Sequence, residues 1–117
     1  MKTIKVMVVD DSSFMRKVVS DLLNSDPEIE VIATARDGLD AWDKLRNLDP
    51  DVILLDVEMP RLDGLALLEK IFEERPRRVV MLSALTQEGS EITMQALDKG
   101  ALDFIPKPSG SISLDIE

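Results

Sequence analysis

Cysteine, histidine and positive charge are missing or scarce in this sequence. The 117 residues contain no cysteine, so the chain has no disulfide framework and no thiol chemistry, which mildly favours a reducing compartment. They contain no histidine either. This absence excludes a Ser-His-Asp catalytic arrangement, or an imidazole-bound zinc site, made by this chain alone.

Negative charge dominates the composition. The chain has 14 lysine and arginine residues against 23 aspartate and glutamate residues, which gives a formal net charge of -9. This balance argues against a surface that binds nucleic acid or an anionic membrane, and we expect a basic partner or a bound cation instead.

Long hydrophobic runs are also lacking. The first apolar run, residues 4–9, is short and ends at Asp10 and Asp11, unlike a signal peptide, and no run approaches the length that spans a membrane. We therefore expect a soluble, cytoplasmic protein with no membrane insertion. A chain of this length is expected to fold as one domain around a single core.

The clearest structural signal is the stretch from residue 52 to residue 64. Four apolar residues, Val-Ile-Leu-Leu, occupy positions 52–55 and stop at Asp56. Such a run fits a strand that is covered on both faces, as in the middle of a parallel sheet. Parallel sheets carry their chemistry beyond the carboxyl ends of their strands. Asp56 is therefore expected at the rim of a crevice, with residues 59–64 turning the chain into a helix.

Similar apolar runs recur along the chain and alternate with stretches of helical spacing. The predicted strands are residues 4–9, 31–33, 52–55, 79–82 and 102–105. Five strands alternating with four helices imply an α/β fold with a doubly wound parallel sheet and right-handed crossovers. The flavodoxin-like strand order 2-1-3-4-5 is the one we expect.

The apolar spacing also predicts which side of each helix is buried. The expected inward positions are Phe14, Val18 and Leu22 with Val19 and Leu23 beside them, then Leu39, Trp42 and Leu45, then Leu65, Leu68, Ile71 and Phe72, and finally Ile92, Ala96 and Leu97. Gly100 is expected to end the last of these helices in a left-handed conformation.

The end of the chain differs from the rest. We expect residues 1–108 to form the folded domain, and residues 109–117 to be a linker or the start of a truncated fifth helix. A sheet of this kind needs helices on both faces, and a fifth helix after the last strand is missing or truncated here. Either the domain has been cut short or another copy of the chain supplies the helix. Without it, apolar surface on the last strand would remain exposed to water.

Three carboxylates are predicted to meet at one edge of the sheet. The first and third strands are neighbours in the expected order, so Asp10, Asp11 and Asp56 come together at the switch point. They would repel one another unless a cation lay between them. Magnesium suits such a site because it prefers oxygen ligands, and the backbone carbonyl of Glu58 is a further candidate ligand. Asp10 and Asp11 could instead serve only to stabilise the N-terminus of the next helix.

Asp56 could act as a nucleophile, since carboxylates are phosphorylated in aspartyl-phosphate enzymes.

Two further polar residues end strands on the same rim. Ser83 and Lys107 follow the fourth and fifth strands, where a hydroxyl and an ammonium group would neutralise the oxygens of a phosphoryl group. Taken alone, Lys107 could be a solvated surface lysine and Ser83 a helix cap.

These residues resemble, in order and spacing, the receiver domains of two-component response regulators. The resemblance covers residues 4–108 and rests on Asp10-Asp11, Leu55 to Pro60, Asp63-Gly64, Ser83-Ala84 and Lys107-Pro108. Residues 85–89 and 103–113 are more narrowly similar to the receivers of chemotaxis protein-glutamate methylesterases. Ala84 differs, because many of those receivers carry a second serine there.

The resemblance implies a CheY-like fold and a site with defined roles. Asp56 would accept a phosphoryl group from a chemotaxis-type histidine kinase, and Lys107 would pair with the phosphate. Mg2+ or Mn2+ would be held by Asp10, Asp11, Asp56 and the backbone carbonyl of Glu58.

Regulation is implied as well. Ser83 would move to the phosphoryl group and Phe104 would turn inward in response, although Phe104 could equally be an ordinary core residue. The domain would promote its own phosphorylation and dephosphorylation. It would gate a methylesterase domain downstream of Glu117, and esterase activity itself would lie outside this chain.

Two other functions fit parts of the pattern. A stand-alone response regulator would act through protein contacts alone. A magnesium-dependent phosphohydrolase would use Asp56 as its nucleophile, with Glu58 as a candidate general acid. Phosphatases of that kind usually need a cap over the site, and 117 residues leave no room for one.

Overall fold

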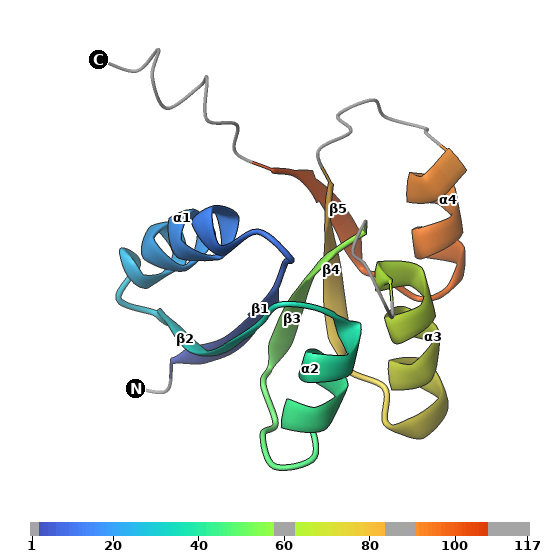
Figure 1. Ribbon diagram of the computed structural model, residues 1–117, viewed down its shortest axis with the longest axis horizontal. Helices are drawn as coiled ribbons and strands as arrows, with labels where there is room; N and C mark the ends of the chain where they lie inside the picture. The colour runs from blue at the N-terminus through green and yellow to red at the C-terminus, as the bar shows by residue number, and fades with distance from the viewer. Residues whose placement is uncertain (1–2, 58–62, 84–90, 108–117) are drawn as a thin grey trace.

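The structure, a computed structural model, describes residues 3–57, 63–83 and 91–107, in which strands and helices alternate along the chain (Figure 1). The elements are β1 (Ile4–Val9), α1 (Ser13–Asn24), β2 (Ile29–Ala35), α2 (Gly38–Lys44), β3 (Val52–Asp56), α3 (Gly64–Glu74), β4 (Arg78–Ser83), α4 (Glu91–Asp98) and β5 (Asp103–Pro106).

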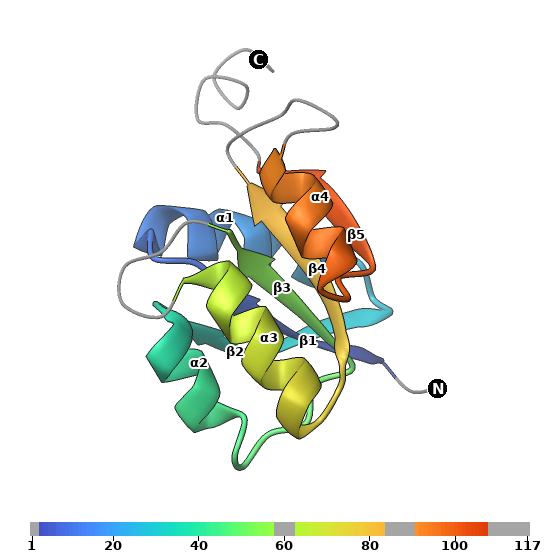
Figure 2. The same cartoon turned by 90° about the vertical axis from the view of Figure 1, so that its right-hand side faces the viewer.

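The five strands form one parallel sheet in the order β2-β1-β3-β4-β5, which confirms the predicted topology. Helix α1 covers one face, and α2, α3 and α4 cover the other (Figure 2). The core is correspondingly split in two. Successive strand residues point to opposite faces, so Val6 and Val8 pack with α1, whereas Met7 and Val9 pack with the other three helices.

Helix starts follow from capping side chains. Ser12 accepts a hydrogen bond from the backbone N–H of Met15 at 3.1 Å. Asp37 and Asp63 do the same at the starts of α2 and α3, at 2.8 and 2.9 Å. A side-chain oxygen at this position satisfies one of the free N–H groups of the first turn. At the end of α4, Gly100 has a φ of 114°, the left-handed conformation predicted for it.

The predicted buried side of α1 is confirmed for Val19 and Leu23 but is wrong for Phe14 and Leu22. Phe14 and Leu22 are 60% and 57% exposed, whereas Val19 is buried and Met15 and Leu23 pack beside it. Two apolar rows run side by side on this helix, and spacing alone does not say which one faces the sheet. The row that faces the sheet is the one through Val19.

Smaller differences concern α2, α4 and the strand ends. Leu39 and Leu97, predicted to point inward, are 47% and 40% exposed, whereas Leu45, Ala96 and Ile71 are buried as expected. Strand β2 runs from residue 29 to 35 and β5 from 103 to 106, so each differs from the predicted limits. Strand ends are the part of a prediction that local sequence fixes least.

Residues 109–117, predicted to be a linker or the start of a truncated fifth helix, lie outside the described residues. Near the end of the described chain, Leu102 just before β5 and Ile105 on β5 are 60% and 44% exposed. Within the described ranges, none of the helices has the length and apolar character needed to cross a membrane.

Candidate acidic phosphoacceptor site

Asp10 and Asp56 stand side by side at the carboxyl ends of the two central strands. Val9 of β1 pairs with Leu55 of β3, and the residue that follows each of them in the sequence is an aspartate. Both are buried, at 0% and 1% exposure. The backbone N–H of Asp10 donates to the carbonyl of Ala35 at 3.0 Å, which ties it to the end of β2. The strand order therefore brings these two carboxylates together, as predicted.

Asp11 completes the acidic cluster from the rim. It is exposed, and one carboxylate oxygen each from Asp10, Asp11 and Asp56 can be chosen so that all lie within 4.8 Å of one another. Hard divalent cations prefer oxygen ligands in such an arrangement. The predicted fourth ligand, the carbonyl of Glu58, lies outside the described residues.

Lys107 joins the two buried carboxylates. Its Nζ lies 3.0 Å from Asp10 Oδ2 and 3.0 Å from Asp56 Oδ2, and its side chain is only 14% exposed. The backbone N–H of Lys107 donates to the carbonyl of Ser83 at 2.8 Å, which fixes this residue against the end of β4. The interpretation of Lys107 as a solvated surface lysine is therefore wrong.

The environment of Lys107 also changes its pKa. Burial by itself would lower the pKa of this ammonium group. Hydrogen bonds and charge attraction from Asp10 and Asp56 outweigh the cost of burial, so the pKa is raised above its ordinary value of 10.5. Among the described residues, Lys107 is the one cation ion-paired with the cluster of three carboxylates, so the cluster retains an excess of negative charge.

Alkaline pH should therefore weaken the fold. A pKa that is higher in the folded state means that the charged ammonium contributes stability in full below pH 10.5, and this contribution is lost as pH rises through the folded-state pKa. We expect the free energy of unfolding to fall more steeply above about pH 10.5 in the native chain than in Lys107→Met. Urea titrations at increasing pH measure both slopes. Equal slopes would count against the buried ammonium.

Ser83 and Phe104 lie on the strands next to the acidic cluster. Ser83 ends β4 and is buried at 1% exposure. Its strand pairs with β3 so that Asp56 is opposite Leu82, one residue before Ser83. Phe104 lies on β5, partly buried, and packs against the core cluster that contains α3 and α4. The arrangement puts Ser83 at the edge of the site, and Phe104 in the core behind it.

Arg16 is a residue of the site that the sequence motifs did not indicate. Its Nη1 donates to the backbone carbonyl of Asp10 at 2.7 Å, and Asp10 Oδ1 accepts from the N–H of Ser12 at 2.9 Å. Helical side chains lean back toward the N-terminus. An arginine four residues into the helix that follows a strand-ending acid is the one sequence feature linked to this contact, and it does not identify a backbone carbonyl as the acceptor.

Gly64 allows α3 to start against the end of β3. A Cβ at this position would overlap the carbonyl oxygen of Asp56 and lie 2.9 Å from Cα of Val57. Both are backbone atoms, which cannot turn aside as a flexible side chain can.

Gly64→Ala should therefore cost about 2 kcal/mol and shift the strand end. We expect urea unfolding to report the lost stability, and amide NMR shifts to change around Asp56. Gly100→Ala is the control. Its Cβ would lie too close to the Phe72 ring, and its φ of 114° is strained for alanine. This variant should therefore destabilise the fold without changing the amide NMR shifts around Asp56. Unchanged stability in Gly64→Ala would contradict this packing.

Comparison with known proteins agrees with the fold. The family model for the response regulator receiver domain matches residues 6–115. The chain therefore belongs to the receiver domain family, as its motifs predicted.

The narrower similarity points to chemotaxis methylesterases. The chain is 56% identical, over 116 residues, to the protein-glutamate methylesterase/protein-glutamine glutaminase of Methanococcus maripaludis, covering 99% of this chain and 32% of the relative. The response regulator domain of Thermotoga maritima CheB has a TM-score of 0.88 at 52% identity, covering 97% of this chain and 84% of that one. The chain spans about a third of the length of the curated relatives that it matches.

A third comparison involves a complex. The chain matches, with a TM-score of 0.82 and 34% identity, a chain of the crystal structure of the P1 domain of CheA3 in complex with CheY6 from R. sphaeroides. The match covers 97% of this chain and 88% of that one.

Proposed function

We propose that this chain is the phosphoacceptor domain of a cytoplasmic chemotaxis response regulator, with Asp56 as the acceptor. The observation that carries the proposal is the position of Lys107, whose ammonium group lies 3.0 Å from a carboxylate oxygen of both Asp10 and Asp56. A cation held at this point can also meet the oxygens of a phosphoryl group bonded to Asp56.

The proposed reaction is a nucleophilic displacement. A carboxylate oxygen of Asp56 attacks the phosphorus of a phosphohistidine, and the P–N bond breaks. The electron pair of that bond goes to the imidazole nitrogen, and an acyl phosphate forms on Asp56. Negative charge spreads over the phosphoryl oxygens during transfer, and the Lys107 ammonium offsets it. Hydrolysis of the acyl phosphate by water would return the domain to its starting state.

The acidic cluster fits a divalent cation. Its donors are carboxylate oxygens within 4.8 Å of one another, and their charge exceeds that of the one lysine between them. We propose that Asp10, Asp11, Asp56 and the carbonyl of Glu58 hold Mg2+ or Mn2+. When bound, the cation would supply positive charge next to the phosphoryl oxygens.

Asp11 allows the cation site to be tested without disturbing the core, because its side chain is exposed. Asp11→Asn removes one proposed ligand charge, so we expect Mg2+ affinity to fall at least about tenfold while the free energy of unfolding changes by less than about 0.5 kcal/mol. Isothermal titration calorimetry measures the affinity. Asp43→Asn, at a side chain that is 77% exposed on α2, is the matched control. Equal affinities in all three proteins would remove Asp11 from the site.

We further propose that Ser83 and Phe104 change their contacts when Asp56 is phosphorylated. The Ser83 hydroxyl would hydrogen-bond the phosphoryl group. Phe104 would repack within the core cluster, to which α4 contributes Ala96. Phosphorylation then shifts an existing equilibrium between two arrangements, by no more than its difference in affinity for them.

The output and the partner are proposed from the relatives. Residues 1–108 would form the receiver, and residues 109–117 a linker or the start of a fifth helix. The match of the family model as far as residue 115 favours the helix. A methylesterase domain would follow Glu117 and would be gated by the receiver. The complex of a CheA3 P1 domain with CheY6 supports a chemotaxis histidine kinase as the phosphoryl donor.

A phosphotransfer assay tests this function. The chain is mixed with the radiolabelled phosphorylated P1 domain of a chemotaxis histidine kinase, with Mg2+ or with EDTA. We expect label to move to the chain only with Mg2+, and to be lost in alkali, as an acyl phosphate is. Rapid release of inorganic phosphate from small phosphate esters would instead favour a phosphohydrolase. No transfer in Mg2+ would contradict the proposal.

A further inference from the structure

We propose that a second ligand site lies between α2 and α3, and that it takes a small anion carrying a flat apolar ring. The cavity has a volume of about 330 Å3, which falls within the usual range of about 300–1,000 Å3 for small-molecule sites. Residues from the C-terminal ends of both helices line it, together with Arg77 just before β4. It therefore lies at the amino ends of the strands, opposite the acidic cluster.

One part of the cavity lining is apolar. Trp42, Leu45 and Ile71 contribute to it. Leu45 and Ile71 are 7% and 1% exposed, so they belong to the buried core. Trp42 packs against the same core, and Lys70 Nζ lies 5.0 Å from the centre of its ring. A planar aromatic wall of this kind suits a flat ring.

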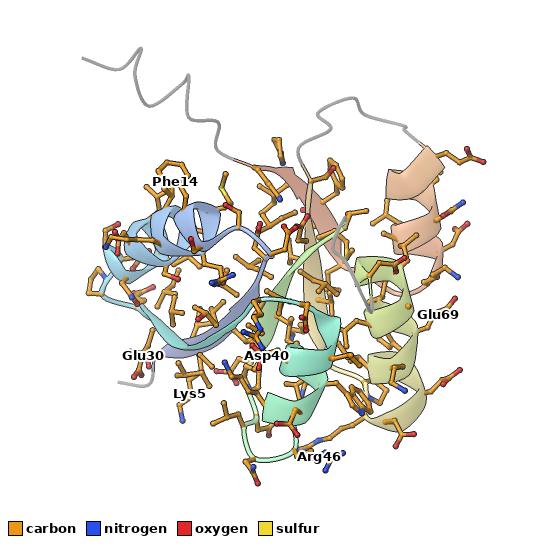
Figure 3. All side chains as sticks on the ribbon, in the orientation of Figure 1. Lys5, Phe14, Glu30, Asp40, Arg46 and Glu69 are labelled. Atoms are coloured by element: carbon orange, nitrogen blue, oxygen red, sulfur yellow. The ribbon has the colours of Figure 1, made fainter. Side chains whose placement is uncertain are left out.

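The other part of the lining is cationic. It contains Arg46, Arg75 and Arg77, against a single acid, Glu74. Arg46 lies beyond the lower end of α2 in Figure 3. Neighbouring carboxylates already pair with these groups: Asp49 pairs with Arg75 and Arg77, and Asp43 lies 4.0 Å from Arg46. An anion in the cavity would share or replace these carboxylates. Guanidinium groups bind carboxylate, phosphonate and phosphate groups through paired hydrogen bonds.

Arg77 is the most buried of the three arginines. Its side chain is only 8% exposed, and its Nε donates to Asp49 Oδ1 at 3.1 Å. Oδ2 of the same carboxylate accepts a hydrogen bond from Arg75 Nη2 at 2.9 Å. Within residues 3–57, 63–83 and 91–107, Asp49 is the only side-chain acceptor that Arg77 reaches, although a guanidinium offers five N–H donors. None of the nitrogen atoms of Arg77 is both buried and without a partner, so its remaining N–H groups can hydrogen-bond water or an anion that enters the cavity.

The chain offers a direct reporter for this site, because Trp42 is its only tryptophan. The probe is phenylphosphonate, in EDTA, since it has both a ring and an anionic group and cannot donate a phosphoryl group. We expect a saturable change in tryptophan fluorescence. Inorganic phosphate lacks the ring and benzyl alcohol lacks the charge, so each should bind at least about tenfold more weakly. No saturable change, or equal binding of all three compounds, would overturn the proposal.

Two variants locate the probe. Arg77→Gln should weaken phenylphosphonate about tenfold, because a charged hydrogen bond within a buried lining is lost. Arg46→Gln should weaken it about threefold, since this side chain is 72% exposed. Lys17→Gln removes the same charge from an exposed position on α1 and should change nothing. Thermal unfolding checks each fold, and if Arg77→Gln does not fold, Arg46→Gln decides. Unchanged affinity in a folded arginine variant, or equal loss in Lys17→Gln, would overturn the site.

Discussion

Asp56→Asn is expected to slow phosphoryl uptake by more than about 100-fold. The neutral amide has nearly the shape of the carboxylate but is not a nucleophile toward phosphorus. Lys107 keeps its second partner, Asp10, at 3.0 Å, so the fold should survive the change. The measurement is the rate of label transfer from the phosphorylated P1 domain.

A matched variant separates the nucleophile from the loss of charge. Asp43→Asn makes the same chemical change at a side chain that is 77% exposed on α2, and it should take up label at the native rate. If Asp56→Asn accepted label as fast as Asp43→Asn, the acceptor would have to be another residue. A loss of transfer in both variants would point to the net charge rather than to Asp56.

Lys107→Met is expected to lower the free energy of unfolding by about 3 kcal/mol in EDTA. The substitution leaves Asp10 and Asp56, both almost fully buried, without the cation that now lies between them. Removing one partner of a buried ion pair costs about 3–5 kcal/mol, because the remaining charge is uncompensated. Urea unfolding near neutral pH measures the loss.

Magnesium should reverse much of this effect. The ammonium group and a divalent cation compete for the same carboxylate oxygens, so Mg2+ should raise the unfolding temperature more in Lys107→Met than in the native chain. Lys17→Met is the control, since Lys17 is 78% exposed in its ion pair with Asp21, and it should change stability by less than about 0.5 kcal/mol. A Lys107→Met variant as stable as the native chain in EDTA would show that the contact contributes nothing to stability.

The sequence was sufficient to predict the fold and the convergence of the acids. The apolar run before Asp56 is informative because four consecutive apolar residues that stop at an acid are typical of a strand buried on both faces. Once strands one and three are neighbours, Asp10 must lie next to Asp56, and this relation needs no knowledge of side-chain packing. Lys107 follows from the same logic, since it comes directly after β5 at the same edge of the sheet.

Other features depend on packing that local sequence does not encode. Either of two adjacent apolar rows on α1 could have faced the sheet, and the exposure of Phe14 follows from the orientation that the helix adopts in the fold. The contact of Arg16 with the carbonyl of Asp10 involves the backbone of one residue, so no pairing of charges in the sequence indicates it. The arginine-lined cavity joins residues from two helices and a strand entry, which become neighbours only in the fold.

The most direct test of Asp56 as the acceptor is to locate the phosphoryl group. The chain is incubated with acetyl phosphate and Mg2+, its intact mass is measured, and borohydride reduction followed by peptide sequencing identifies the modified residue. We expect a single phosphoryl addition that depends on Mg2+ and maps to Asp56. A stable addition at another residue, or no addition when the chain is folded and binds Mg2+, would contradict the assignment of Asp56 as the acceptor.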